Sequence, residues 1–342
     1  MSFIAFIVRR LVHSIFVLLG LSVVIFIISR IMPGDPARMA VGARAPQWAV
    51  DNLREQMHLE DPLYAQYYYW LRDALHGDFG ISLVTRRPVA DDIKEVFPAT
   101  LELTLFAGII MGGAGIGLGT LSAWHKDKWI DNVLRVVSYL GVVTPSFVFA
   151  ILFLLLFGMS LKWMPTMGRI SADVSRPSSV TGLLIIDSLL AGNLRAFFDA
   201  LWHLILPGIA LAMSGLAQEA RITRSTMSDN LTKDYIASAR SLGIPEKVIM
   251  RKFLLKPSLI PTVSILGLDF AGTMSSAFLV EFIFNWPGMS RYGINAMLRK
   301  DLNAIAAVIM ILGVVFIIVN IAVDLVIAQL DPRIRLAPGR GE

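Results

Sequence analysis

The stretch DYIASARSLGIPEKVIMRKFLLKPSLIP, residues Asp234–Pro261, lies between two long apolar segments, although its own pattern is helical. Its residues recur at spacings of three and four, which places apolar groups on one helical face: Ile236, Ala239, Arg240, Val248, Ile249 and Phe253. Gly243 breaks the first helix, and Pro245 with Glu246 opens the second, because proline fits a first helical turn and a carboxylate suits a helix N-terminus. The stretch therefore predicts two short helices joined by a glycine turn.

The charge of this region leaves two interpretations open. From Arg221 to Lys256 there are eight Lys or Arg residues against three Asp or Glu residues. Basic helices with an apolar face can lie on lipid headgroups. The same face can instead be covered by a docked protein partner, and the pattern alone favours neither reading.

The composition indicates a polytopic membrane protein. The chain has 342 residues, of which 55% are hydrophobic and 17% charged, whereas soluble domains carry about 25% charged residues. The net charge of +5 then reflects loop asymmetry and does not indicate a nucleic-acid partner. The sequence has no cysteine, which excludes disulfides and thiolate chemistry.

Six segments reach the roughly 20 apolar residues that a membrane span requires: Leu11–Ile31, Leu101–Ala123, Val133–Leu161, Leu201–Thr226, Leu259–Phe284 and Ala304–Gln329. The predicted fold class is an all-α polytopic membrane protein with six transmembrane helices. Basic residues at Arg9 and Arg10, in the loops 125–128 and 221–256, and in the C-terminal tail all fall on one side. Because Lys and Arg gather in cytoplasmic loops, both termini are predicted to be cytoplasmic.

The spans predict the organisation of the chain. It has an N-terminal transmembrane helix over 1–31, an outer loop over 32–98, a five-helix core over 99–330 that contains the cytoplasmic loop 228–258, and a cytoplasmic tail over 331–342.

Residues 182–206 could be mistaken for a seventh span. A span there would bury Asp187, Arg195 or Asp199, and each charge costs about 2.5–3.5 kcal/mol at a helix centre. We expect an amphipathic excursion on the outer surface that leads into the fourth span.

Glycines and intramembrane polar groups give further expectations. The second span carries Gly108, Gly112, Gly113, Gly115, Gly117 and Gly119, and glycines four apart let another helix approach closely. Asp269, Ser276 and Glu281 of the fifth span are candidates for lining a translocation path, because intramembrane carboxylates face a cavity or a partner. For Asp269, structural pairing with a neighbouring helix is an equal alternative. Asp324 is expected to reach water or Arg333.

The sequence offers no catalytic constellation. Its histidines are scattered, and it has neither Cys/His metal-ligand spacing nor a phosphate-binding G-x-x-x-x-G-K-[ST] motif. We therefore predict a transport subunit that is not an enzyme, holds no metal and is driven from outside the chain.

Motifs along nearly the whole chain give a family resemblance. They are Met32–Pro36 (MPGDP), Asp61–Tyr67 (DPLYAQY), Gly77–Ser82 (GDFGIS), Arg87–Val89 (RPV), Pro98–Leu101 (PATL), Pro165–Gly168 (PTMG), Phe284–Met289 (FNWPGM) and Asp331–Arg335 (DPRIR). In order and spacing the chain resembles the permease subunits of ABC importers of the oligopeptide, dipeptide and nickel group, and within it the first of the two permease partners. The resemblance implies a type I ABC importer permease fold.

The resemblance also gives the opening stretch a role. The family's coupling motif, E-A-A-x-x-x-G, corresponds here to residues with Ala237 at the glutamate position. The implied ATPase-coupling residues are Tyr235, Ala237, Ser238, Ala239, Arg240, Leu242 and Gly243. Such a helix sits in a cleft of the ATPase subunit, which favours protein docking over lipid binding. Pro257 departs from the asparagine expected before the fifth span.

The implied assembly contains a homologous second permease, two ABC ATPases that hold ATP and Mg, and an extracytoplasmic solute-binding protein, in a bacterial or archaeal plasma membrane. The chain itself would bind no cofactor. Di- or oligopeptides are the expected cargo, with nickel complexes, oligosaccharides or peptide conjugates as alternatives. A stand-alone channel or secondary carrier is the more remote alternative.

Overall fold

The computed structural model describes residues 3–31, 36–42, 44–56 and 58–330, and their regular structure is helical. The elements are α1 (Phe3–Ile31), α2 (Pro36–Val41), α3 (Gln47–Gln56), α4 (Leu63–Leu75), α5 (Val89–Trp124), α6 (Trp129–Val143), α7 (Ser146–Phe153), the π-helical η1 (Leu154–Ser160), α8 (Leu184–Leu190), α9 (Leu194–Asn230), α10 (Asp234–Ser241), α11 (Glu246–Val248), the π-helical η2 (Ile249–Leu255), α12 (Lys256–Ile283), α13 (Met289–Leu298) and α14 (Leu302–Leu330). The predicted all-α class is confirmed. The motif residues 32–35 and the tail 331–342 lie outside the described residues.

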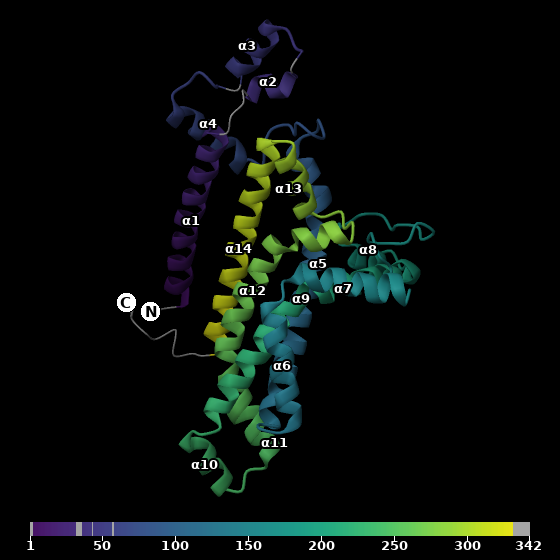
Figure 1. Cartoon of the computed structure of the whole chain (residues 1–342). Coiled ribbons are helices and arrows are strands. Elements are labelled where there is room, and N and C mark those ends of the chain that lie inside the picture. The colour runs from purple at the N-terminus through teal and green to yellow at the C-terminus, as the bar shows by residue number, and fades with distance from the viewer. Residues whose placement is uncertain (1–2, 32–35, 43, 57, 331–342) are drawn as a thin grey trace.

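Five helical stretches among the described residues are long and apolar enough to cross a membrane: Val8–Arg30, Val89–Trp124, Leu194–Asn230, Glu246–Ile283 and Leu302–Gln329. They cover five of the six predicted spans. In Figure 1, α1 stands at one side next to α14, and the short helices α2 to α4 lie beyond its far end. We call the end of the molecule that carries α10 the α10 end and the opposite end the α13 end.

The third predicted span is broken, which corrects the expectation of one continuous helix. The segments Trp129–Val143 and Ser146–Ser160 are each helical but meet at a bend of 106°, and Figure 1 shows α7 turned sideways from α6. The cause is Pro145, which has no backbone N–H and disfavours helical geometry at the preceding residue. Thr144 is accordingly extended, with φ −85° and ψ 121°.

The excursion before α9 satisfies its charges locally. Asp187 accepts hydrogen bonds from the backbone and hydroxyl of Thr181, at 2.8 and 2.7 Å, and from the backbone of Gly182 at 3.0 Å. Burial favours a higher pKa for Asp187, but these hydrogen bonds together hold the pKa below its usual value. The expected excursion is shorter than 182–206, because α9 begins at Leu194; Asp199, in the early turns of α9, accepts from the backbone and hydroxyl of Ser171.

Two glycines bring α5 and α9 into backbone contact. A Cβ at Gly115 would lie 2.6 Å from the Cβ of Glu219, and one at Gly119 would lie 2.6 Å from the carbonyl oxygen of Ala220. Side chains at these positions would force the two helices apart, so the predicted close approach of a neighbouring helix is confirmed for this face.

The remaining glycines of α5 divide into two faces. Cβ atoms at Gly108 and Gly112 would meet Phe270 and Leu266 of α12, so this predicted pair also faces a helix. Gly113 and Gly117 have nothing within 4 Å in the described part of the chain.

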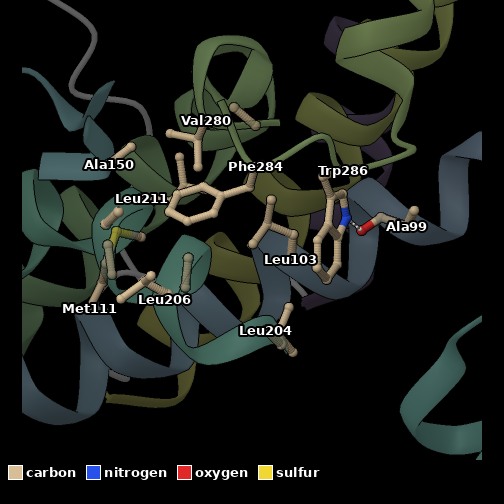
Figure 2. Packing of buried hydrophobic residues seen from close by; sticks show 14 residues of the cluster. Ala99, Leu103, Met111, Ala150, Leu204, Leu206, Leu211, Val280, Phe284 and Trp286 are labelled. Atoms are coloured by element: carbon tan, nitrogen blue, oxygen red, sulfur yellow. Dashed lines mark hydrogen bonds between the residues drawn. The ribbon is translucent and has the colours of Figure 1, made fainter. Parts of the chain in front are cut away.

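The apolar core joins α5, α9 and α12 around two sequence motifs (Figure 2). Trp286 is fully enclosed and donates from its indole nitrogen to the carbonyl oxygen of Ala99 at 2.9 Å. Phe284 packs in the same cluster as Leu103 and Leu204. Motifs nearly two hundred residues apart, PATL and FNWPGM, therefore form one contact.

Gly119→Ala and Gly117→Ala are expected to change stability in opposite directions. The first places a Cβ against the backbone of α9 and costs about 1–3 kcal/mol by overpacking. The second meets open space and gains about 0.5–1 kcal/mol of helix propensity. The thermal unfolding midpoint of the purified chain in detergent, followed by tryptophan fluorescence, measures both effects. Equal midpoints would contradict the role given to the α5–α9 contact.

Candidate functional site

The segment that carries α10, α11 and η2 packs against the transmembrane helices through an apolar cluster, which we call the anchoring cluster. It consists of Ala123, Met227, Ile236, Ala239, Ile249, Met250 and Leu254. These residues come from α5, α9, α10 and η2, and η2 continues directly into α12. α10 therefore packs in one interior with the ends of α5 and α9 and with η2, which leads into α12.

The turn after α10 explains why glycine is needed there. Gly243 has φ +70°, a conformation that costs little only for glycine. The amide of Gly243 donates to the Arg240 carbonyl at 2.9 Å, and the amide of Ile244 donates to the Ala239 carbonyl at 3.2 Å. These bonds cap the last carbonyls of α10 in a Schellman motif. The Arg240 guanidinium also lies 2.7 Å from the Glu246 carboxylate.

The predicted coupling residues fall on two faces of α10. Tyr235, Ala237 and Ser238 face outward, and Leu242 is 80% exposed although it is apolar. Ala239 is only 4% exposed because it packs with Ile236 in the anchoring cluster. The structure thus assigns Ala239 to holding the helix in place and not to its outward surface.

Two predicted path residues line one cavity of about 570 Å³ between α5, α6, α7, α9 and α12. Asp269 and Ser276 contribute from α12, together with Thr273, and Ser214 and Gln218 contribute from α9. The rest of the lining is largely apolar, with Phe147, Leu211, Leu268, Phe278 and Leu279 among it. The arrangement offers one carboxylate and several hydrogen-bonding groups within an apolar wall, which suits a polar organic solute.

Glu281 lies elsewhere. Its side chain is fully buried, accepts from the Thr100 hydroxyl at 2.5 Å and from the Arg291 amide at 3.0 Å, and is not among the residues that line this cavity. A Cβ at Gly288 would lie 2.4 Å from its carboxyl carbon. Glu281 therefore organises the FNWPGM turn within this chain.

An ion pair that sequence reasoning missed joins α5, α6 and α9. Asp131 is fully buried and accepts from the Arg224 guanidinium at 2.6 and 2.7 Å. It also accepts from the Ser122 hydroxyl at 2.5 Å and the Asp127 amide at 3.0 Å. Such bidentate pairing fixes geometry as well as charge. The sequence shows only that Asp131 lies at the start of α6 and Arg224 near the end of α9, which does not indicate that the two are paired.

A second unforeseen pair joins the first and last helices. Arg10 of α1 lies 2.7 Å from the carboxylate of Asp324 in α14. Asp324 was expected to reach water or Arg333, and Arg333 lies outside the described residues. Its partner in the structure is therefore a residue from the other end of the sequence.

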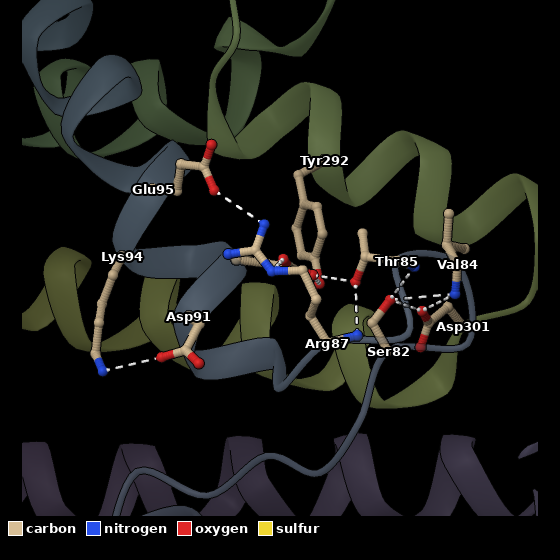
Figure 3. Close-up of polar contacts among 10 residues, drawn as sticks. Ser82, Val84, Thr85, Arg87, Asp91, Lys94, Glu95, Tyr292 and Asp301 are labelled. Carbon is tan, nitrogen blue, oxygen red and sulfur yellow. Dashed lines mark hydrogen bonds and ion pairs between the residues drawn. The ribbon is translucent and has the colours of Figure 1, made fainter.

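At the α13 end, polar contacts hold the outer loop to the core (Figure 3). The Ser82 hydroxyl donates to Asp301 at 2.6 Å, and the Tyr292 hydroxyl donates to Asp92 at 3.2 Å. Arg87 lies 3.5 Å from the same Asp92 carboxylate. The GDFGIS motif is thus held to Asp301, which lies between α13 and α14, whereas Asp92 of α5 joins Arg87 of the RPV motif to Tyr292 of α13.

Comparisons with known proteins agree with this architecture. The family described as binding-protein-dependent transport system inner membrane component matches residues 115–336. The N-terminal family of the same transport-system membrane components matches residues 3–104.

Three relatives match nearly end to end. The probable D,D-dipeptide transport system permease protein DdpB of Escherichia coli (strain K12) is 38% identical over 100% of this chain and 99% of its own length. The dipeptide transport system permease protein DppB of Alkalihalophilus pseudofirmus is 36% identical over 97% and 99%. The glutathione transport system permease protein GsiC of Escherichia coli (strain K12) is 32% identical over 96% and 98%. The chain therefore belongs to the family of binding-protein-dependent transport system inner membrane components, as a multi-pass permease subunit of an ABC importer in a bacterial inner membrane.

Proposed function

We propose that this chain forms half of the translocation pathway of an importer for di- or oligopeptides. The observation that carries the proposal is the α10 platform, a short helix with an exposed outward face that is packed into the ends of three long helices. The relatives named above are permeases of dipeptide, D,D-dipeptide and glutathione systems, and these cargoes are all short peptides.

The α10 end faces the cytoplasm in this proposal, because the basic loop 221–256 lies there. One of the two ABC ATPase subunits docks on the outward face of α10; the ATPases bind ATP and Mg, while this chain carries no cofactor. A homologous second permease completes the pathway, and a solute-binding protein delivers peptide at the α13 end.

Coupling follows from the packing. ATP-driven closure of the ATPases favours one arrangement of the permease helices over the other, as any two-state device requires. The anchoring cluster moves α12 together with α10, and α12 carries Asp269 and Ser276 into or out of contact with the solute. Asp269 can pair with the ammonium group of a peptide N-terminus.

Expression of the chain with its genomic neighbours in cells that lack other peptide importers is expected to give ATP-dependent uptake of a labelled dipeptide. Inactive ATPase subunits should abolish uptake. Uptake of nickel complexes or oligosaccharides without peptides would overturn the substrate class and leave the permease role intact. Conduction by the purified chain alone in vesicles would instead favour a channel.

Leu242→Asp is expected to weaken ATPase association about tenfold, or about 1.4 kcal/mol, because it replaces the exposed apolar side chain at the C-terminal end of α10 with a charge. Co-purification of the ATPases and the thermal stability of the permease are measured together. Leu75→Asp is the matched control, since Leu75 is 77% exposed but lies in α4. Equal ATPase recovery from both variants would exclude α10 as the docking site.

Gly243→Ala is expected to loosen α10 and to reduce peptide-stimulated ATP hydrolysis, because an alanine at φ +70° costs about 1–2 kcal/mol. Hydrogen exchange of the α10 amides should accelerate roughly five- to thirtyfold. Gly192→Ala provides the control, with φ +64° and equally open surroundings before α9. If both variants hydrolyse ATP alike, rigidity of α10 is not needed for coupling.

A further inference from the structure

A second cavity, of about 350 Å³, lies between α5, α6 and α9 on the α10 side of the α6–α7 bend. Three arginines line it: Arg135, Arg221 and Arg224. Hydroxyl groups make up much of the remaining polar surface, and they belong to Ser122, Ser138, Tyr139 and Ser225. Leu118, Leu134, Ala220 and Ile222 complete the lining, which includes no Asp or Glu.

Two of the three positive charges are not neutralised within the described residues. Arg224 is paired with Asp131 at the cavity wall. Arg135 donates to the side-chain oxygen of Asn132, and Arg221 donates to that of Gln218 at 2.7 Å, so both have neutral partners. Across the part of the chain that the structure describes, no carboxylate lies within 4.0 Å of either guanidinium. Two guanidinium groups at the cavity are therefore free to pair with a bound anion.

The surface beside the cavity is apolar. Along α6, large side chains remain exposed: Trp129, Val133, Val136, Val137, Leu140 and Val143. Such a flank suits hydrocarbon chains, and the aromatic Trp129 begins the helix where a membrane interface is expected. A basic, hydroxyl-lined cavity next to an apolar helix face matches a molecule with an anionic head and acyl chains.

We propose that this cavity binds the phosphate group of an anionic phospholipid from the leaflet at the α10 end. Guanidinium groups bind phosphate oxygens through paired hydrogen bonds, and the Ser138 and Ser225 hydroxyls can donate to the remaining oxygens. The Ser122 hydroxyl already donates to Asp131. Basic pockets between transmembrane helices on the cytoplasmic side are known sites for anionic headgroups. The bound lipid links Arg135 of α6 to Arg221 of α9, two helices that Asp131 and Arg224 already join. The inference rests on the cytoplasmic orientation of the α10 end proposed above and is independent of the peptide cargo.

The test uses the whole transporter, purified with its co-expressed partner subunits and reconstituted in nanodiscs of phosphatidylethanolamine with a minor share of phosphatidylglycerol. Native mass spectrometry after detergent release counts the lipids retained. The wild-type complex is expected to retain phosphatidylglycerol in preference to phosphatidylethanolamine. The double variant Arg135→Gln/Arg221→Gln should weaken that retention roughly thirtyfold, about five- to sixfold for each guanidinium–phosphate contact that is lost.

The matched control is Lys126→Gln/Lys128→Gln. It removes the same charge from the same end of the molecule, but both lysines are exposed and neither lines the cavity. Equal loss of phosphatidylglycerol in both double variants would reduce the effect to general surface charge and overturn the proposal. Absence of any preference for phosphatidylglycerol in the wild type would also overturn it.

A second experiment keeps all three cavity arginines and therefore tests lipid binding even if the double variant does not fold. A photo-reactive amino acid at Tyr139, which lines the cavity, is expected to cross-link to phosphatidylglycerol. Cross-linking to another polypeptide would show that a partner subunit fills the cavity instead. If inorganic phosphate at millimolar concentration binds the complex and abolishes the lipid cross-link, the site serves free phosphate, and the lipid assignment fails.

Discussion

The backbone contact between α5 and α9 is the constraint on which the rest of the structure depends. Gly115 and Gly119 allow the two helices to approach until side chains no longer separate them. In a bilayer, where lipid tails are as apolar as leucine, such close packing replaces the hydrophobic drive that holds soluble proteins together. The α5–α9 pair then supplies the wall for both cavities, for the Asp131–Arg224 pair and for the core around Trp286.

The α10 platform is packed against the chain on one side and exposed on the other. Its inward residues, Ile236 and Ala239, share the anchoring cluster with α9 and η2, while Leu242 remains open on the other side. The Gly243 turn and the Arg240–Glu246 ion pair stabilise the C-terminal end of α10 and leave the Leu242 side chain exposed. Residues of α10 and the turn after it therefore serve either inward packing or outward exposure, which explains why small, apolar and charged residues alternate there.

Sequence reasoning reached the helical class and the local excursion before α9, because these depend on periodicity and on the cost of burying charge. It reached the glycine faces only in part: Gly108 and Gly112 meet α12, whereas Gly113 and Gly117, also four apart, meet no neighbour among the described residues. It did not reach the bend at Pro145, since proline is tolerated inside transmembrane helices and the apolar run continues through it. Periodicity placed Ala239 on an apolar face with Ile236 and Ile249, but it did not show that the chain's own anchoring cluster covers this face. Pairs such as Arg10–Asp324 join distant segments, and a single sequence does not display such contacts.

The broken third segment also sets an order of events during biogenesis. Residues 129–160 form one apolar stretch with a break of only two residues, so they enter the bilayer together as the ribosome delivers them. The helix that α7 packs against, α9, is synthesised later. Pro145 sets the bend locally, but the contacts that hold α7 against α9 can form only once α9 has been made. Topogenesis and final shape are separate steps for this segment.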